Sequence, residues 1–413
     1  MLRIGDFLKR NKTAITIEDD KTYKRVTIKV RNGGIFLRDE EIGSKIGTKN
    51  QFLISKGQFL LSKIDARNGA FGVVPEILDG GIITGNFWTF DVDYSIINPH
   101  YLALLTTTDA FIKYCEQASN GTTNRHYLQE PLFLKIKVPV PSLEEQNKLV
   151  EEYNKQIFSA NNLLKKAQLE EKTIQTYILT QLGIKLPNET ISKKTRNSHL
   201  ISFVKYKDVD RWDMWSKEQH ITTLLNNSIY PISKLGLLDF TTRSWKKDSD
   251  SFRYIEMSDV DPIYGIFNDT KLSTINAPSR ATQYIKTGDL IIGTTRPYLK
   301  RFAIVSEKYN QCICSSAFQV IKPNNNYNIE FIYYFLQTQL AIIQFETYMT
   351  GALYPAINTT DLRQIKIPIP PLSIQNSIVL YANKKRENAK SYILKSKQKY
   401  IEALKNFETQ IFE

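Results

Sequence analysis

Two stretches of this chain, VPVPSLEEQNKLV at 138–150 and IPIPPLSIQNSIV at 367–379, repeat one another at a shift of 229 residues (367 minus 138). Earlier segments repeat at almost the same distance: Tyr23–Val26 matches Phe252–Ile255, Lys56–Leu61 matches Thr287–Ile292, Ile83–Phe87 matches Cys314–Phe318, and Gly121 matches Gly351. A collinear series with so little drift indicates duplication, and its period is far longer than the 20–50 residues of solenoid repeats. The chain is therefore predicted to hold two copies of one domain-plus-helix module, which suits a ligand with two similar parts.

Length and composition indicate a folded protein of two or three domains. The chain has 413 residues, of which 42% are apolar and 23% charged, and these values are ordinary for globular domains. It contains no run of 18 apolar residues, and its start, MLRIGDFLKRNK, lacks a signal-peptide core. Three cysteines are too few for a disulfide framework, and Cys312 and Cys314 are expected to be buried on one face of a strand. We therefore expect a cytoplasmic protein without a membrane segment.

The charge of the chain favours a polyanionic ligand. The net charge is +13 and the pI is about 9.3, a balance that is typical of nucleic-acid-binding proteins. A merely basic protein from an AT-rich genome would also be rich in Lys, Asn and Ile. Charge alone therefore leaves both interpretations open.

Each repeat ends in a long predicted helix. Lys137–Pro141 is expected to be extended because proline disfavours helix in the preceding residue, and Ser142 with Glu145 forms a capping box. The first helix is predicted from about Ser142 to Leu182, before Gly183, and the second from about Leu372 to Phe412. Forty residues make a rod of roughly 60 Å. A narrow apolar stripe requires a partner; the two helices most simply pack on each other, and the alternative is that each lies on its own domain.

The rest of the chain divides into two similar globular domains of the α+β class. The predicted boundaries are 1–141 for the first domain, 142–183 for the first helix, 184–200 for a polar and basic linker, 201–371 for the second domain and 372–413 for the second helix. Short β-rich runs are predicted at Val26–Val30, Gln58–Ile64 and Ile82–Val92. One amphipathic helical stretch is predicted after Asn98-Pro99, and its counterpart follows Asn328.

The sequence lacks the patterns of common catalytic sites. Asn98-Pro99-His100-Tyr101 superficially resembles the Asn-Pro-Pro-Tyr motif of adenine methyltransferases, but His replaces the second proline and no glycine-rich cofactor loop precedes it. There is no Walker loop, and the four histidines are scattered rather than grouped as metal ligands. No convincing Ser/His/Asp, Cys/His or nuclease carboxylate set is present. We therefore predict a binding protein with no catalytic residues, no metal and no cofactor of its own.

Loops at equivalent places in the two domains carry residues that are suited to DNA. Arginine can bind guanine and asparagine can bind adenine through two hydrogen bonds, whereas Thr, Lys and Tyr can hold phosphates. The candidates in the first domain are Lys63, Arg67, Asn68, Asn86, Asn120, Thr122, Asn124 and Arg125, and those in the second are Thr294, Thr295, Arg296, Tyr298, Lys300, Arg301, Ser315 and Tyr354. Any one of them could equally belong to a solvated turn. As a set, similar frames with divergent loops indicate two readers of different short sequences.

The whole chain resembles the specificity subunit of type I restriction-modification systems. The resemblance is carried by the two helix starts at Pro139–Gln146 and Pro368–Gln375, the Gly288–Ile292 strand and Arg211-Trp212-Asp213. It implies two target recognition domains separated by an antiparallel coiled coil, each reading half of a split double-stranded DNA site. It also implies two modification subunits, which supply S-adenosylmethionine chemistry, and restriction subunits, which cleave. The first copy lacks a counterpart of Arg211–Gln219, so residues of the C-terminal helix are candidates to complete its edge.

Two other functions compete with this interpretation. In a type IIB-like system, one partner subunit both methylates and cuts, and the genes next to this one would distinguish the two cases. A protein of another class, a scaffold with two lectin-like or protein-binding domains, would not bind DNA. Salt-sensitive DNA binding would exclude such a scaffold, because phosphate contacts give a steep salt dependence.

Overall fold

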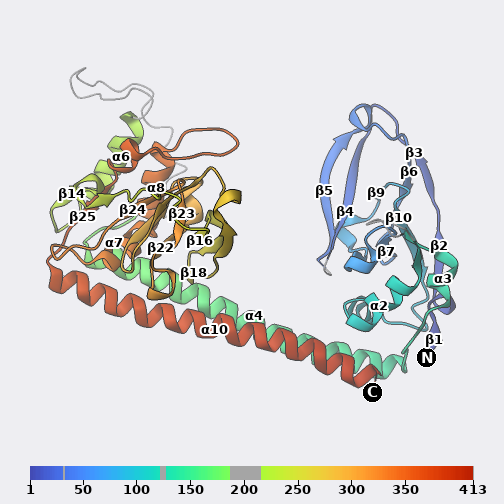
Figure 1. The fold of residues 1–413 in the computed structure, drawn as a ribbon. Helices are drawn as coiled ribbons and strands as arrows, with labels where there is room; N and C mark the ends of the chain where they lie inside the picture. The colour runs from blue at the N-terminus through green and yellow to red at the C-terminus, as the bar shows by residue number, and fades with distance from the viewer. Residues whose placement is uncertain (31–32, 121–126, 187–214, 413) are drawn as a thin grey trace. The chain divides into compact units, whose positions relative to one another are not determined.

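The computed structural model describes residues 1–30, 33–120, 127–186 and 215–412 (Figure 1). The chain forms two compact units, Met1–Asn162 with Lys395–Glu413, and Leu163–Leu394. Among the described residues, no helix is both long enough and apolar enough to span a bilayer.

The first unit is a mixed α/β domain that ends in a long helix. Its strands are β1 (Leu2–Arg3), β2 (Leu8–Asn11), β3 (Ala14–Thr16), β4 (Thr22–Lys29), β5 (Gly34–Ile42), β6 (Asn50–Leu53), β7 (Phe59–Ser62), β8 (Phe71–Val73), β9 (Ile82–Ile83), β10 (Phe87–Val92), β11 (Ser119–Asn120), β12 (Tyr127–Leu128) and β13 (Lys137–Val138). Its helices are α1 (Pro99–Leu105), α2 (Asp109–Gln117), α3 (Glu130–Lys135) and the first half of α4 (Leu143–Gln181).

The second unit is built from similar elements. Its strands are β14 (Ile232–Lys234), β15 (Phe240–Thr241), β16 (Ser251–Ile255), β17 (Val260–Asp261), β18 (Gly265–Ile266), β19 (Thr270–Ser273), β20 (Ala281–Tyr284), β21 (Leu290–Gly293), β22 (Phe302–Ile304), β23 (Ile313–Ser315), β24 (Phe318–Ile321) and β25 (Lys366–Pro368). Its helices are α6 (Trp215–Leu225), α7 (Ile329–Leu336), α8 (Gln339–Tyr348), α9 (Thr359–Leu362) and most of α10 (Leu372–Phe412).

The main sheets of the two units share one strand order, apart from the additional strand β3 of the first unit. The order β2-β10-β7-β8 in the first unit matches β15-β24-β21-β22 in the second, and β6-β9-β4-β5 matches β20-β23-β16-β19. Even the parallel pair inside an otherwise antiparallel sheet recurs, as β4 with β9 and β16 with β23. The predicted fold class, with two similar mixed α/β domains and a long antiparallel helix pair, is confirmed.

One sequence prediction needs correction. The helical stretch predicted after Asn98 is two helices, because Thr108 caps the N-terminus of α2 by accepting a hydrogen bond from Phe111 N (3.2 Å). Thr338 breaks the corresponding stretch between α7 and α8. Ile184, at the start of the predicted linker, is 3% exposed and belongs to the core of the second unit. Residues 187–200 of that linker, and Arg211–Asp213, lie outside the described residues.

The repeated glutamine explains why the Pro-x-Pro helix starts recur. Gln146 accepts a hydrogen bond from Asn98 N (2.7 Å) and donates one to Pro141 O (2.8 Å), and both hydrogen bonds are partly buried. Gln375 makes the same two bonds, with Asn328 N (2.8 Å) and Pro370 O (2.7 Å). Since an unpaired buried amide is costly, this side chain fixes the start of each long helix against the globular domain of its own unit.

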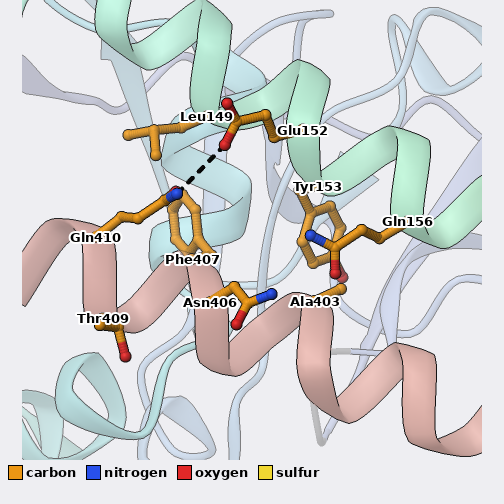
Figure 2. A pocket seen from close by; sticks show the side chains of 9 residues that line it. All are labelled: Leu149, Glu152, Tyr153, Gln156, Ala403, Asn406, Phe407, Thr409 and Gln410. Carbon is orange, nitrogen blue, oxygen red and sulfur yellow. Dashed lines mark hydrogen bonds between the residues drawn. The ribbon is translucent and has the colours of Figure 1, made fainter.

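In the first unit, α4 and α10 pack antiparallel and complete the domain core. Phe407 of α10 is 2% exposed and contacts the rings of Tyr101 (5.6 Å between centroids) and Tyr153 (6.4 Å). Figure 2 shows Phe407 between the two helices beside Gln410, which donates a hydrogen bond to Glu152 (3.2 Å). The C-terminal helix therefore supplies part of the core of the first unit.

In the second unit, the helix pair holds a buried arginine. Arg386 of α10 forms an ion pair with Glu171 of α4 (2.7 Å) and donates to Tyr333, Gln337 and the carbonyl of Pro262. Burial opposes the charge of Arg386, but Tyr333 and Glu171 outweigh it, so its pKa is raised. One side chain thus joins both helices, α7 and the β17–β18 hairpin.

Replacing Arg386 is expected to lower the free energy of unfolding of the second unit. Arg386→Leu leaves Glu171 partly buried without its partner, and loss of one member of a buried pair costs about 3–5 kcal/mol. Denaturant unfolding of the full chain measures this change. Adding Glu171→Leu should recover most of the loss, whereas Lys390→Leu, at the exposed pair with Glu387, should change stability by less than about 1 kcal/mol. Equal effects of Arg386→Leu and Lys390→Leu would contradict the role given to Arg386.

Candidate nucleic-acid interface

The predicted reader loops of the two units are held by one repeated set of backbone hydrogen bonds. In the first unit, Lys63 N donates to Asn86 O (3.0 Å), and Leu128 N donates to Lys63 O (2.9 Å). In the second unit, Thr294 N donates to Ala317 O (2.9 Å), and Ile357 N donates to Thr294 O (2.9 Å). Three separate segments therefore meet in the same way in both units, while their side chains differ.

In the first unit, this frame presents a tight turn after β7. Asn68 N donates to Asp65 O (2.9 Å), and the Asn68 side-chain amide lies 3.3 Å from an Asp65 carboxylate oxygen. Gly69 ends the turn with a φ of 74°, which glycine adopts without strain. Asn68 and Asn86 are exposed and Lys63 is half-buried.

Several candidates of the first unit cannot be placed. The backbone of Arg67 lies in the turn and that of Asn120 in β11, but their side chains are not described. Thr122, Asn124 and Arg125 lie outside the described residues. Their role in DNA binding stays a prediction.

In the second unit, the loop after β21 brings Arg296 and Tyr354 together. The guanidinium of Arg296 lies 4.8 Å from the centre of the Tyr354 ring and donates to Leu353 O (3.0 Å). Its backbone N donates to Pro355 O (2.7 Å), and its φ of 49° is unusual for a residue with a side chain. Tyr354 is 71% exposed. A stacked arginine and an exposed aromatic ring therefore occupy one surface, next to Thr294 and Thr295.

Four other candidates of the second unit point into the protein. Arg301 donates to the carbonyls of Met257 (2.7 Å) and Val260 (2.9 Å), and Ser315 is only 3% exposed. Tyr298 packs against the main core. Burial, with the nearby Arg386 charge, lowers the pKa of Lys300, although Glu171 opposes the change. These residues support the loop, whereas Tyr354 is exposed and the half-buried Arg296 stacks on it.

Neither a metal-ligand cluster nor an exposed thiol occurs among the described residues. They hold no cluster of three or more potential metal ligands among His, Cys, Asp and Glu. All three cysteines are buried, and burial raises the thiol pKa of each, that of Cys314 to about 12, so they remain protonated at neutral pH. The hydrogen-bond frame was not foreseen because backbone pairing leaves no signature in side-chain identity. The Arg296–Tyr354 stack was not foreseen because its two residues lie 58 positions apart in the sequence.

Comparison with known proteins now gives the family. A model of the type I restriction modification DNA specificity domain matches residues 1–172 and 240–382. The chain therefore belongs to this family and is a specificity subunit of a type I restriction-modification system, a DNA-recognition subunit without catalytic activity of its own. The match supports neither the type IIB-like alternative nor the scaffold without DNA function.

Three solved structures align with nearly the whole chain, and one of them has a TM-score above 0.5. One, from work on the "complex assembly and conformational transition of the type I R-M system", has 15% identity and a TM-score of 0.54 over 99% of this chain and 95% of its own. The HsdS subunit from Thermoanaerobacter tengcongensis has 16% identity and a TM-score of 0.40, over 99% and 94%. The S subunit from M. genitalium has 12% identity and a TM-score of 0.41, over 98% and 95%. No curated protein matches the sequence.

Proposed function

We propose that this subunit reads a split double-stranded DNA sequence, one half with each unit, in the cytoplasm. Two modification subunits would bind it and supply adenine methylation from S-adenosylmethionine, and restriction subunits would join to cleave unmodified DNA. The exposed residues after β7 and β21 would contact the two half-sites, and α4 with α10 would set the spacing between them.

The observation that carries this proposal is the repeated frame with divergent side chains. Equivalent backbone bonds hold Lys63 in one unit and Thr294 in the other, so both loops begin from the same frame. The residues on those loops differ, with Asn68 and Asn86 in one and Arg296 and Tyr354 in the other. A protein that bound one repeated ligand would need similar side chains at both places. Different side chains on loops that are held by equivalent hydrogen bonds fit the recognition of two different base sequences.

The first expected result is that the purified chain neither methylates nor cuts DNA. It should show sequence-specific, salt-sensitive binding to DNA that carries the host's methylated sequence, and methylation should appear only when modification subunits are added. Incorporation of labelled methyl groups and gel analysis of cleavage measure the two activities. Methyl transfer by the rigorously purified chain would contradict the assignment of catalysis to partner subunits.

A second expected result concerns Arg296. If this guanidinium binds a base, Arg296→Ala should weaken binding to the cognate site by about 1–3 kcal/mol and relax one position of one half-site. Competition binding against a panel of single-base variants measures both effects. Arg363→Ala is a matched control, since Arg363 is exposed and stacks on Phe240 (4.7 Å) in the same unit. Uniform weakening on all sequences would make Arg296 a phosphate contact instead.

A further inference from the structure

The β4–β5 hairpin of the first unit is an exposed ribbon that the predicted reader loops do not include. Its strands pair over eight positions, from Thr22 opposite Ile42 to Lys29 opposite Gly34. Strand β5 stands at the edge of its five-stranded sheet, and Figure 1 shows β4 and β5 as a long two-stranded element of this unit.

The inner face of this ribbon anchors it beside the first reader loop. Val26 and Ile28 are buried, at 6% and 9% exposure. Ile35, opposite Ile28, packs onto Gly72, where an added Cβ would stand 2.9 Å from the Ile35 side chain. Gly72 is in β8, the strand that directly follows the Lys63–Gly69 loop. The ribbon is therefore fixed next to residues already predicted to contact DNA.

The outer face of the ribbon carries cations and an aromatic ring. Lys29 is exposed, and its ammonium lies 4.4 Å from the centre of the Phe36 ring, which is 42% exposed. The side chain of Arg38 is 63% exposed, and its Nε lies 3.6 Å from a carboxylate oxygen of Asp39, so this cation is partly neutralised in the free protein. Residues 27–38 contain no carboxylate, and the acidic residues of β5 stand nearer the base, where Arg25 pairs with Asp39 (2.6 Å). The distal half of the ribbon is thus positively charged.

The equivalent strands of the second unit are shorter. There β16 and β19 have five and four residues, whereas β4 and β5 have eight and nine. The short β17–β18 hairpin between them is tied down, since Pro262 O accepts a hydrogen bond from Arg386 (3.0 Å). The long charged ribbon is therefore a feature of one domain, as expected for an element that reads one half-site.

We propose that the β4–β5 ribbon contacts the DNA of the first half-site, with Lys29 and Arg38 on backbone phosphates and Phe36 against an apolar base edge. A two-stranded ribbon fits the major groove of B-DNA, and phenylalanine can contact the thymine methyl group there. This inference rests on the proposed DNA-reading function and adds a second contact element to the first unit.

The phosphate contacts are tested by the salt dependence of DNA binding by the full chain. Each phosphate contact contributes a slope of about −0.9 to the logarithmic salt dependence, so Lys29→Gln with Arg38→Gln should reduce the slope by about 1.8. The control, Lys165→Gln with Lys166→Gln, removes the same charge from exposed positions of α4 and should leave the slope unchanged. Equal slopes for the two double variants would overturn the assignment.

The base contact is tested by mapping the sequence methylated in the native host. Phe36→Ala should relax one position of a single half-site, and Leu37→Ala, a neighbour that is 45% exposed on the opposite face of the strand, should not. An unchanged pattern for Phe36→Ala, in a protein whose circular dichroism matches the wild type, would overturn this part. If Phe36→Ala bound DNA as the wild type does but no longer assembled with the modification subunits, the ribbon would instead be a protein contact. If the wild-type chain itself bound no DNA, the proposed function would fail, not only this inference.

Discussion

Exchanging the second domain should change one half of the methylated sequence and leave the other half intact. The exchange replaces residues 206–366 with the equivalent domain of a relative that reads another sequence. The expected effect is complete at one half-site because the Arg296–Tyr354 surface belongs wholly to the exchanged segment. The Lys63 and Asn86 frame of the first unit is untouched. Mapping of methylated bases across the host genome measures both halves at once.

The helix pair makes demands on the incoming domain. Tyr333 and Gln337 lie inside the exchanged segment and bond to Arg386, which lies outside it. An incoming domain without these partners would leave a buried cation unsatisfied, so Arg386 and Glu171 must be exchanged with it. A matched control exchanges the first domain instead and should alter the other half-site. A new sequence in both halves after one exchange would contradict independent reading.

The sequence predicted the long helices well because their signals are local. The capping box at Ser142 and Glu145 forms as expected, and α10 runs from Leu372 to Phe412 as predicted. The domain interiors were predicted less well because three-residue interruptions such as Thr106–Thr108 barely disturb a helical pattern. The domain boundaries themselves stay predictions.

The sequence predicted where the candidate loops lie but not how their side chains are arranged, and their role as a site stays a prediction. The repeat placed the loops after β7 and β21 at equivalent positions, and the hydrogen-bond frame agrees with that placement. The sequence could not distinguish the roles of Arg296 and Arg301. Arg296 stacks on an exposed ring, whereas Arg301 donates hydrogen bonds to the carbonyls of Met257 and Val260. Both are arginines in one turn, and only tertiary contacts distinguish them. The β4–β5 ribbon was missed because only Val26–Val30 had been recognised as a strand.

Lengthening both helices by seven residues should lengthen the unread spacer of the DNA site. Seven residues preserve the apolar stripe to within about 20° and add about 10 Å of rise, which is comparable to about three base-pair steps of ~3.4 Å. Insertions near Leu163 and near Ile393 fall where α4 and α10 pass from one unit to the other. We expect one to three added base pairs, because each added base pair also rotates one half-site around the DNA axis relative to the other, and both domains must still contact their half-sites.

The insertions must be paired to be informative. A heptad in α4 alone would shift its register against α10 and would break either the Ser396–Ala160 contact (2.9 Å) of the first unit or the Arg386–Glu171 pair of the second. That single insertion is therefore the control that should lose activity. The paired variant should keep both half-sites, since the Gln146 and Gln375 bonds that hold each domain to its helix lie far from the insertions in sequence. Methylome mapping decides the matter: an active paired variant with an unchanged spacer would show that the helices do not set the distance, whereas a longer spacer between unchanged half-sites would assign that role to the helix pair.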